Sequence, residues 1–305
     1  MRGRTLGRRR LAGLLFPLAV VVSTPAAGPA AAVLPTRSVY TAGTATFHGS
    51  TGDSVLNGPL VDMAASRGGE GYWQLGSDGG VFSYGDAPFY GSTGDIKLNR
   101  PVVSMSPTGS GTGYWFVATD GGIFAYGDAG FFGSTGAMVL NQPVVGMAPT
   151  STGNGYLLVA SDGGVFAFGD AGFSGSLGGQ TLEAPIVSLS PLPSGDGYWL
   201  LDRQGKVYAF GNADQTLGGN SFEGASFTDI QATPTGDGYW RLNRAGTIFA
   251  HGDAADLQPG VVLGPGQMAV GIASTTDGRG LWVTTSGRSR PSTAGATGPH
   301  TFLGE

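Results

Sequence analysis

"GYWFVATDGGIFAYGDAGFFGSTG", residues 113–136, has a near-copy on each side of it along the chain. Residues 71–94 read GYWQLGSDGGVFSYGDAPFYGSTG and residues 155–178 read GYLLVASDGGVFAFGDAGFSGSLG, so the copies begin 42 residues apart. A repeat period of about 40 residues is typical of propellers and solenoids, in which every repeat is one supersecondary unit. This stretch therefore predicts a repeat architecture for most of the chain.

Each unit is predicted to contain four short strands. In the second unit these are PVVSMSP (101–107), YWFVAT (114–119), GIFAYG (122–127) and GFFGS (130–134). The turn signals TGSGTG, TDGG and GDAG separate them, and Asp-Gly between two apolar runs favours a hairpin because the turn needs positive φ. Four antiparallel strands per repeat are typical of a propeller blade.

The two ends of the chain complete each other. Residues 38–50 are the second half of a unit, and residues 266–286 are the first half of one. Pairing them makes a sixth blade and leaves no sheet edge exposed. We therefore expect an all-β fold over residues 33–288: a six-bladed β-propeller with four antiparallel strands per blade, closed by N-terminal strands that complete the C-terminal blade.

The first 32 residues are predicted to be a secretory signal peptide. A basic segment precedes an apolar run of 12 residues, and the small residues before Ala32 form a cleavage site. The run is too short to span a membrane. An uncleaved anchor and twin-arginine export through Arg8 and Arg9 are the alternatives to ordinary secretion. Residues 289–305 match no repeat position and are predicted to be a flexible tail.

Composition excludes several classes of partner. Removing the first 32 residues removes five arginines and no acidic residue, which leaves 11 basic and 21 acidic residues and a net charge near −10. Such a surface repels nucleic acid and anionic lipid, so we expect neither a nucleic-acid partner nor membrane insertion after cleavage. The chain has no cysteine, which excludes disulfides and thiolate metal sites. We expect a secreted monomer.

The combination GYW…SDGG[VI]F…GDA…GSTG…LN-x-P resembles the tandem repeats of secreted actinobacterial proteins. The similarity covers residues 38–288. In that group the repeats occur alone or beside cell-wall-active and glycan-active domains, so the resemblance implies a role at a cell surface. The fourth and fifth units depart from the pattern, because Gln204 and Ala245 replace the aspartate of the DGG turn.

The candidate binding residues lie on one predicted face. The DGG turns join the second and third strands and share this face with the connections between units. The acids and bases involved are Asp78, Asp120 and Asp162 of the turns, and Asp53, Asp95, Lys97, Arg100 and Glu183 of the connections. They predict a polar groove for a glycan or a weak Ca²⁺ site with oxygen ligands. The alternative is that each aspartate only stabilises its turn.

Other repeated residues are interpreted as structural. All five tryptophans occupy one repeat position, which favours packing between blades over a sugar-binding aromatic surface. The aspartate of GDA is replaced by Asn212 in one unit, which favours a turn role over a metal site. Arg241 breaks the pattern inside a strand and is included among the candidate ligand-binding residues; the alternative is a side chain that reaches water from the strand end. His48 and His251 stand at aromatic positions and are predicted to be packing residues.

No residue is predicted to be catalytic. A catalytic triad needs a histidine beside a serine and a carboxylate, and glycoside hydrolysis needs two facing carboxylates. The sequence favours a binding module for a cell-wall or environmental glycan, with no cofactor beyond the weak Ca²⁺ site. A structural or adhesive protein that binds other proteins is the second possibility. A glycan-active hydrolase or lyase, using Glu70, Glu183 or Glu223, is the third.

Overall fold

The computed structural model describes residues 37–219, 221, 224 and 226–289. The chain divides into two compact units, Met1–Leu34 and Pro35–Glu305, and the described residues all belong to the second. The predicted signal peptide, Glu223 and the tail beyond Ser289 lie outside the described residues. No helix in the described part of the chain is long and apolar enough to cross a membrane.

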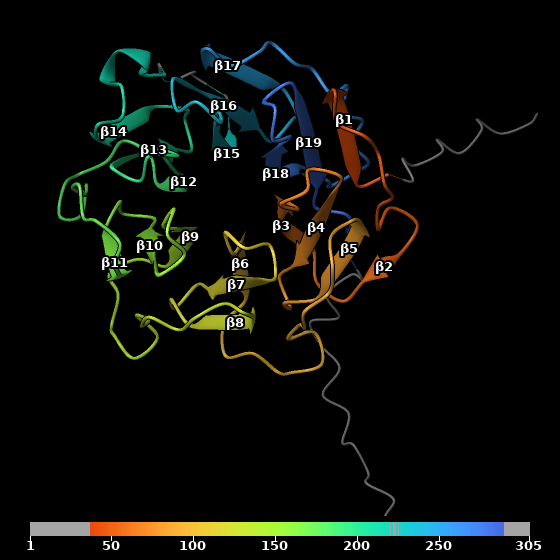
Figure 1. The fold of residues 1–305 in the computed structure, drawn as a ribbon, viewed down its shortest axis with the longest axis horizontal. Coiled ribbons are helices and arrows are strands. Elements are labelled where there is room, and N and C mark those ends of the chain that lie inside the picture. The colour runs from red at the N-terminus through yellow and green to blue at the C-terminus, as the bar shows by residue number, and fades with distance from the viewer. Residues whose placement is uncertain (1–36, 220, 222–223, 225, 290–305) are drawn as a thin grey trace, which may run out of the picture. The chain divides into compact units, whose positions relative to one another are not determined.

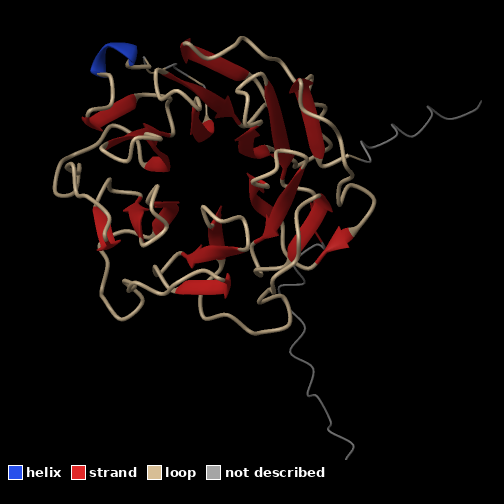
Figure 2. Ribbon diagram, viewed as in Figure 1, coloured by secondary structure: helices blue, strands red, loops and turns tan. Residues whose placement is uncertain are grey.

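The described residues form six three-stranded antiparallel sheets (Figure 1 and Figure 2), which confirms the all-β prediction. The innermost strands are β3 (Leu60–Ala65), β6 (Val102–Pro107), β9 (Val144–Pro149), β12 (Ile186–Pro191), β15 (Phe227–Ala232) and β18 (Ala269–Ser274). The middle strands are β4 (Gly71–Gly76), β7 (Gly113–Ala118), β10 (Gly155–Ala160), β13 (Gly197–Asp202), β16 (Gly238–Asn243) and β19 (Gly280–Thr285). The outer strands are β5 (Val81–Gly85), β8 (Ile123–Gly127), β11 (Val165–Gly169), β14 (Val207–Gly211), β17 (Ile248–Gly252) and β1 (Val39–Gly43).

The first strand of the described chain shares a sheet with the last two of the repeat. This sheet has the order β1-β19-β18, and Val39 lies opposite Thr284 in its antiparallel ladder. The innermost strands contact one another in chain order, and β18 contacts β3. A short parallel pair joins β2 (Val55–Leu56) to β20 (Arg288–Ser289), so Ser289 of the predicted tail is paired with Leu56. One 3-10 turn, Gln215–Leu217, follows β14.

The predicted fourth strand of each unit is not seen in the described residues, because each of the six repeated sheets has three strands. A glycine interrupts the segment that follows four of the six outer strands, at Gly49, Gly91, Gly133 and Gly175. Gly91 has φ of 136° and Gly133 has φ of 132°, which L side chains rarely adopt. A Cβ at Gly91 would come within 2.4 Å of the Tyr126 ring, so the segment lies against the next sheet. Close packing against an aromatic ring therefore replaces a fourth hydrogen-bonded ladder.

A tyrosine hydroxyl holds this segment in place, and we call the arrangement the tyrosine latch. Tyr114 lies in the middle strand of the next sheet, and its hydroxyl donates to the Gly91 carbonyl at 2.7 Å. The Tyr90 N–H donates to the same hydroxyl oxygen at 3.0 Å. Equivalent hydroxyl-to-carbonyl bonds are made by Tyr72, Tyr156, Tyr198 and Tyr239. Each of these bonds ties one sheet to the segment that follows the preceding sheet.

The tryptophans pack between sheets, as predicted. All five are fully buried, so no sugar ring can stack on them. The Trp115 indole N–H donates to the Gly130 carbonyl at 2.6 Å, and its ring contacts Tyr156 of the next sheet with ring centroids 6.0 Å apart. Buried aromatic pairs of this kind contribute about 0.5–1.5 kcal/mol beyond the area they bury.

The aspartates of the GDA turns are structural, also as predicted. Asp128 accepts hydrogen bonds from the hydroxyls of Thr108 and Thr112, both at 2.8 Å, and from Ser110 at 2.5 Å. These bonds, the one from Ser110 first, hold the pKa of Asp128 below its usual value. The donors are hydroxyls of the adjoining hairpin rather than the turn's own backbone. In the fourth sheet Asn212 donates to Asp196 instead, at 2.6 Å.

Candidate functional site

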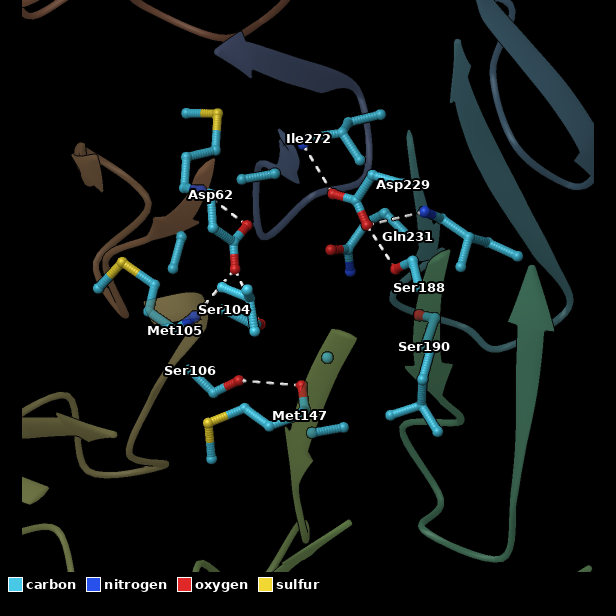
Figure 3. A pocket seen from close by; sticks show the side chains of 18 of the residues that line it. Asp62, Ser104, Met105, Ser106, Met147, Ser188, Ser190, Asp229, Gln231 and Ile272 are labelled. Carbon is cyan, nitrogen blue, oxygen red and sulfur yellow. Dashed lines mark hydrogen bonds between the residues drawn. The ribbon is translucent and has the colours of Figure 1, made fainter. Parts of the chain in front are cut away.

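The six innermost strands surround a cavity of about 360 Å³, shown in Figure 3. A β-bulge in each strand shapes its wall. In β3, Leu60 pairs with Gly76 and Asp62 pairs with Leu75, which leaves Val61 without a partner in the ladder. The same irregularity occurs in the other five innermost strands. A bulge changes the direction of nearby side chains, and bulges are common beside binding sites.

The residue after each bulge forms what we call the channel ring. Its members in chain order are Asp62, Ser104, Gly146, Ser188, Asp229 and Gly271. All of them except Gly271 line the cavity. Two of the six are carboxylates, and none of the residues that line this cavity, all within the described part of the chain, is basic. The sequence analysis missed these two aspartates. The available signal was an acid at one position of the first predicted strand of a unit, the strand that reads PVVSMSP in the second unit. Four other copies have serine or glycine at this position.

Asp62 connects two neighbouring innermost strands. Its Oδ2 accepts from the Ser104 hydroxyl and from the Met105 N–H, both at 2.9 Å, and its Oδ1 accepts from the Met63 N–H at 2.7 Å. Although Asp62 keeps part of its surface open to the cavity, protein surrounds its carboxylate. Burial raises the pKa of Asp62, and the charge of Asp229 raises it further. The three hydrogen bonds lower this pKa but do not cancel the increase.

Asp229 on β15 connects three innermost strands, because it accepts hydrogen bonds from β12 and from β18 (Figure 3). Its Oδ1 accepts from the Ser188 hydroxyl at 2.6 Å and from the Ile230 N–H at 2.9 Å, and its Oδ2 accepts from the Ile272 N–H at 3.0 Å. Burial raises the pKa of Asp229, while these bonds lower it. The bonds of both carboxylates are directed to the protein itself, so the ring ties strands together around the cavity.

Two further pockets lie at the end of the sheets that carries the DGG turns, which we call the DGG face. The upstream pocket has a volume of about 420 Å³ and includes Arg100, Asp120, Asn141 and Gln142. The downstream pocket has a volume of about 310 Å³ and includes Gln142, Asp162, Gln180 and Glu183. All eight residues of the downstream pocket stand 42 positions after residues of the upstream pocket. The repeat therefore builds the same pocket twice, and the two pockets share Gln142.

The DGG aspartates use one carboxylate oxygen to stabilise their turns. Oδ1 of Asp120 accepts from the Gly122 N–H at 2.9 Å, and Oδ1 of Asp162 accepts from the Gly164 N–H at 3.0 Å. Asp78 makes the same bond in the first sheet, with Gly80 at 3.0 Å. The second oxygen of each has no hydrogen-bond partner among the described residues. The turn role is thus confirmed, and one oxygen per aspartate stays available to a ligand.

The structure brings some of the predicted site residues together and separates others. Arg100 lines the same pocket as Asp120, and Glu183 lines the same pocket as Asp162. Asp95 is exposed and lines neither pocket. The exposed connections also include Asp53 and Lys97. In the described part of the chain, no three His, Asp or Glu side chains are grouped so that they could hold a metal ion.

Arg241 lies away from both pockets. Its side chain is fully buried and does not reach water, so the alternative of an arginine that extends from the strand end is wrong. Its guanidinium donates to the Gly205 carbonyl, contacts Nε2 of His251 at 2.7 Å and lies 5.0 Å from the ring centroid of Phe227. Burial, and secondarily the charge of Arg241, lowers the pKa of His251 to about 4. His251 also stacks on Tyr239, which confirms its packing role.

The two units without a DGG aspartate stabilise the turn from another position. Oδ1 of Asp202 accepts from the Gln204 and Lys206 N–H groups, both at 2.9 Å. Oδ1 of Asn243 accepts from the Thr247 N–H at 2.9 Å. The acceptor side chain has therefore moved to the last residue of the middle strand, which leaves the turn itself without a free carboxylate.

No family model matches this chain, and no curated protein matches it. The resemblance to secreted actinobacterial repeats therefore stays a prediction. Among solved structures, the chain is similar to the β-propeller domain of Cps50 (Swd1) from Myceliophteria thermophila. The TM-score is 0.48 at 10% sequence identity, and the match covers 74% of this chain and 82% of that chain. At this level of similarity the match says nothing about the ligand or activity of this chain.

Proposed function

We propose that this chain is a secreted, non-catalytic binding module that recognises a glycan on its DGG face. The observation that carries the proposal is the pair of equivalent pockets that share Gln142. Two sites that are built from the same repeat positions and share a residue suit a ligand that itself repeats, as a polysaccharide does. The carboxylate and amide groups in these pockets can accept and donate hydrogen bonds to sugar hydroxyls.

The proposal includes the finer architecture. We infer six blades in a closed ring, with β1 completing the blade of β18 and β19. The contact between β18 and β3, together with the β1–β19 ladder, supports this inference. A closed ring would hold neighbouring pockets at a fixed spacing, and a preformed site loses less conformational entropy when a polymer binds.

Secretion and a role at a cell wall are also part of the proposal. They rest on the basic, apolar and small-residue segments within residues 1–32 and on the resemblance described above. The acidic surface after removal of these residues is consistent with a chain that avoids nucleic acid and anionic lipid.

A protein-binding role is the second candidate, and one observation favours it. Phe89, Phe131 and Phe173 occupy one repeat position and are 60%, 64% and 61% exposed. Exposed apolar groups that recur on one part of a surface often mark protein contacts. A structural or adhesive protein would use this row instead of the pockets.

The test is retention of the secreted chain on insoluble peptidoglycan, chitin, cellulose and starch, with and without Ca²⁺. We expect retention on at least one polymer, and weaker retention of a triple variant with Asp78→Asn, Asp120→Asn and Asp162→Asn. Asparagine keeps the Oδ1 acceptor of each turn, so the fold is preserved. The control is the triple variant Asp86→Asn, Asp128→Asn and Asp170→Asn, which removes the same number of negative charges from turns at the opposite end of the same sheets. Failure to bind any polymer would contradict the glycan function.

A further inference from the structure

We propose that the glycan is a partly de-N-acetylated amino-sugar chain, with an N-acetylated unit in the upstream pocket and a free ammonium in the downstream pocket. This inference rests on the glycan-binding function and specifies its ligand. It follows from the positions at which the two equivalent pockets differ.

The charge of the two pockets differs at two positions. Arg100 of the upstream pocket corresponds to Gln142 of the downstream pocket, and Asn141 corresponds to Glu183. The upstream pocket therefore has one cation and one carboxylate, Asp120. The downstream pocket has two carboxylates, and its lining residues, all of them described by the structure, include no basic side chain.

The negative charge of the downstream pocket is not neutralised within the described chain. Only Oδ1 of Asp162 has a hydrogen-bond partner there, the Gly164 N–H. Glu183 is exposed and forms no hydrogen bond or ion pair with a described residue. An ammonium group would therefore meet two carboxylates that have oxygen lone pairs available. In the upstream pocket the Arg100 guanidinium would repel the same ammonium group.

The apolar surface differs between the pockets as well. Met138 is 56% exposed and Val139 is fully exposed beside Asn141 in the upstream pocket. The corresponding downstream residues are the polar Gln180 and Thr181. An N-acetyl group presents a methyl group and an amide, which match an apolar side chain and an asparagine amide. The upstream pocket therefore suits an acetylated unit, and the downstream pocket suits a free amine.

The net negative charge of the whole chain also favours binding of a positively charged polymer. The chain without residues 1–32 has 11 basic and 21 acidic residues. A polymer with scattered positive charges is attracted to such a surface over a distance of several ångströms. This long-range attraction alone would not distinguish one end of the sheets from the other, and the two pockets supply that distinction.

The experiment compares three amino-sugar hexamers of equal length: fully acetylated, fully deacetylated and half acetylated. Binding to the full secreted chain is measured by calorimetry at about 0.05 M and about 0.5 M salt, because screening weakens charge pairs. We expect the half-acetylated hexamer to bind most tightly. We expect Glu183→Gln to weaken its binding about threefold to fivefold, the range of an exposed ion pair, and to leave the fully acetylated hexamer unchanged.

The matched control is Glu70→Gln, which removes one exposed negative charge from the opposite end of the sheets. An equal loss in both variants would show a nonspecific charge effect and overturn the inference. Equal affinity for all three hexamers would overturn the amino-sugar inference while glycan binding stands. Absence of binding to every hexamer and to all four insoluble polymers would overturn the glycan function itself.

Discussion

One side-chain position in the innermost strands determines the charge of the central cavity. The channel ring contains Asp62 and Asp229. Each carboxylate accepts two hydrogen bonds from neighbouring strands and one from the next residue of its own strand. Those bonds stabilise the charged form, whereas burial and mutual repulsion favour the protonated form. The raised pKa of both groups means that burial outweighs the bonds. The ring is therefore a place where the stability of the fold depends on pH.

Ionisation of the Asp62 carboxyl group is expected to destabilise the fold. Because the folded state holds the Asp62 proton more tightly than the unfolded state, its stabilising contribution is complete below the ordinary carboxyl pKa. It is lost as the pH rises through the raised pKa. We expect Asp62→Asn, which cannot ionise, to flatten the fall in melting temperature between about pH 4 and neutrality, given the unfolded value near 3.9. If the melting temperatures of the variant and of the parent chain fall in parallel as the pH rises, the raised pKa of Asp62 is contradicted.

The contribution of His251 to stability depends on pH in the opposite direction. Its pKa in the fold, about 4, lies below the unfolded value near 6.5. Its contribution is therefore complete above the unfolded pKa and is lost as the pH falls toward 4. We expect His251→Phe, which places the residue type of Phe168 and Phe210 at this position, to reduce the loss of stability between about pH 6.5 and pH 4. The measurement is urea unfolding at several pH values, and an unchanged slope would refute the prediction.

At the scale of the element, the tyrosine latch takes the place of a fourth strand. A strand would fix the outer segment through several ladder bonds, while the latch fixes it through one hydroxyl that donates to Gly91 and accepts from Tyr90. The segment is then free to curve around the ring of the next sheet. The joint between sheets thus depends on single side chains that recur once per unit.

The latch is tested by Tyr114→Phe. The variant keeps the buried ring and loses both hydrogen bonds, so we expect a loss of about 1–3 kcal/mol in the free energy of unfolding. The control is Tyr126→Phe in the adjacent strand, whose hydroxyl has no hydrogen-bond partner among the described residues. Chemical denaturation should show a lower free energy of unfolding for Tyr114→Phe than for Tyr126→Phe. A similar loss in both would mean that the ring, and not the hydroxyl, secures the joint.

At the scale of the whole described unit, repetition explains both what the sequence predicts and what it does not. The period and the Asp-Gly turns predict the strands because both signals are local. The fourth strand is mispredicted because GFFGS resembles a strand locally, whereas Gly133 and Tyr156 determine its path from the next sheet. The burial of Arg241 is mispredicted for the same reason. The Gly205 carbonyl that its guanidinium binds lies 36 positions away in the sequence, so no local signal indicates the contact. The sequence predicts that the candidate binding residues share one face. Only the structure shows that they form two pockets whose residues correspond to one another.

The inferred ring closure predicts tolerance of new chain ends. A circular permutant would join residue 289 to residue 37 through a short Gly-Ser linker and open the chain at residues 95–97, which are exposed. We expect one cooperative thermal transition, because β1 and β19 stay paired and no sheet is divided. Circular dichroism would follow the transition. A permutant without strand signal, beside a folded parent with the same linker added, would contradict closure.

The β1–β19 ladder also has a mechanical consequence. Val39 at the start of β1 lies opposite Thr284 near the end of β19, so a force that separates residues 38 and 286 acts on one end of the ladder. The backbone hydrogen bonds between β1 and β19 then break one after another from this end. They do not bear the force together, as they would if the strands were pulled past each other along their length. Under tension the chain would open at this seam at low force, while the tyrosine latches still hold the neighbouring sheets. A fold whose sheets are joined by buried aromatic residues would thus resist tension weakly in this one direction.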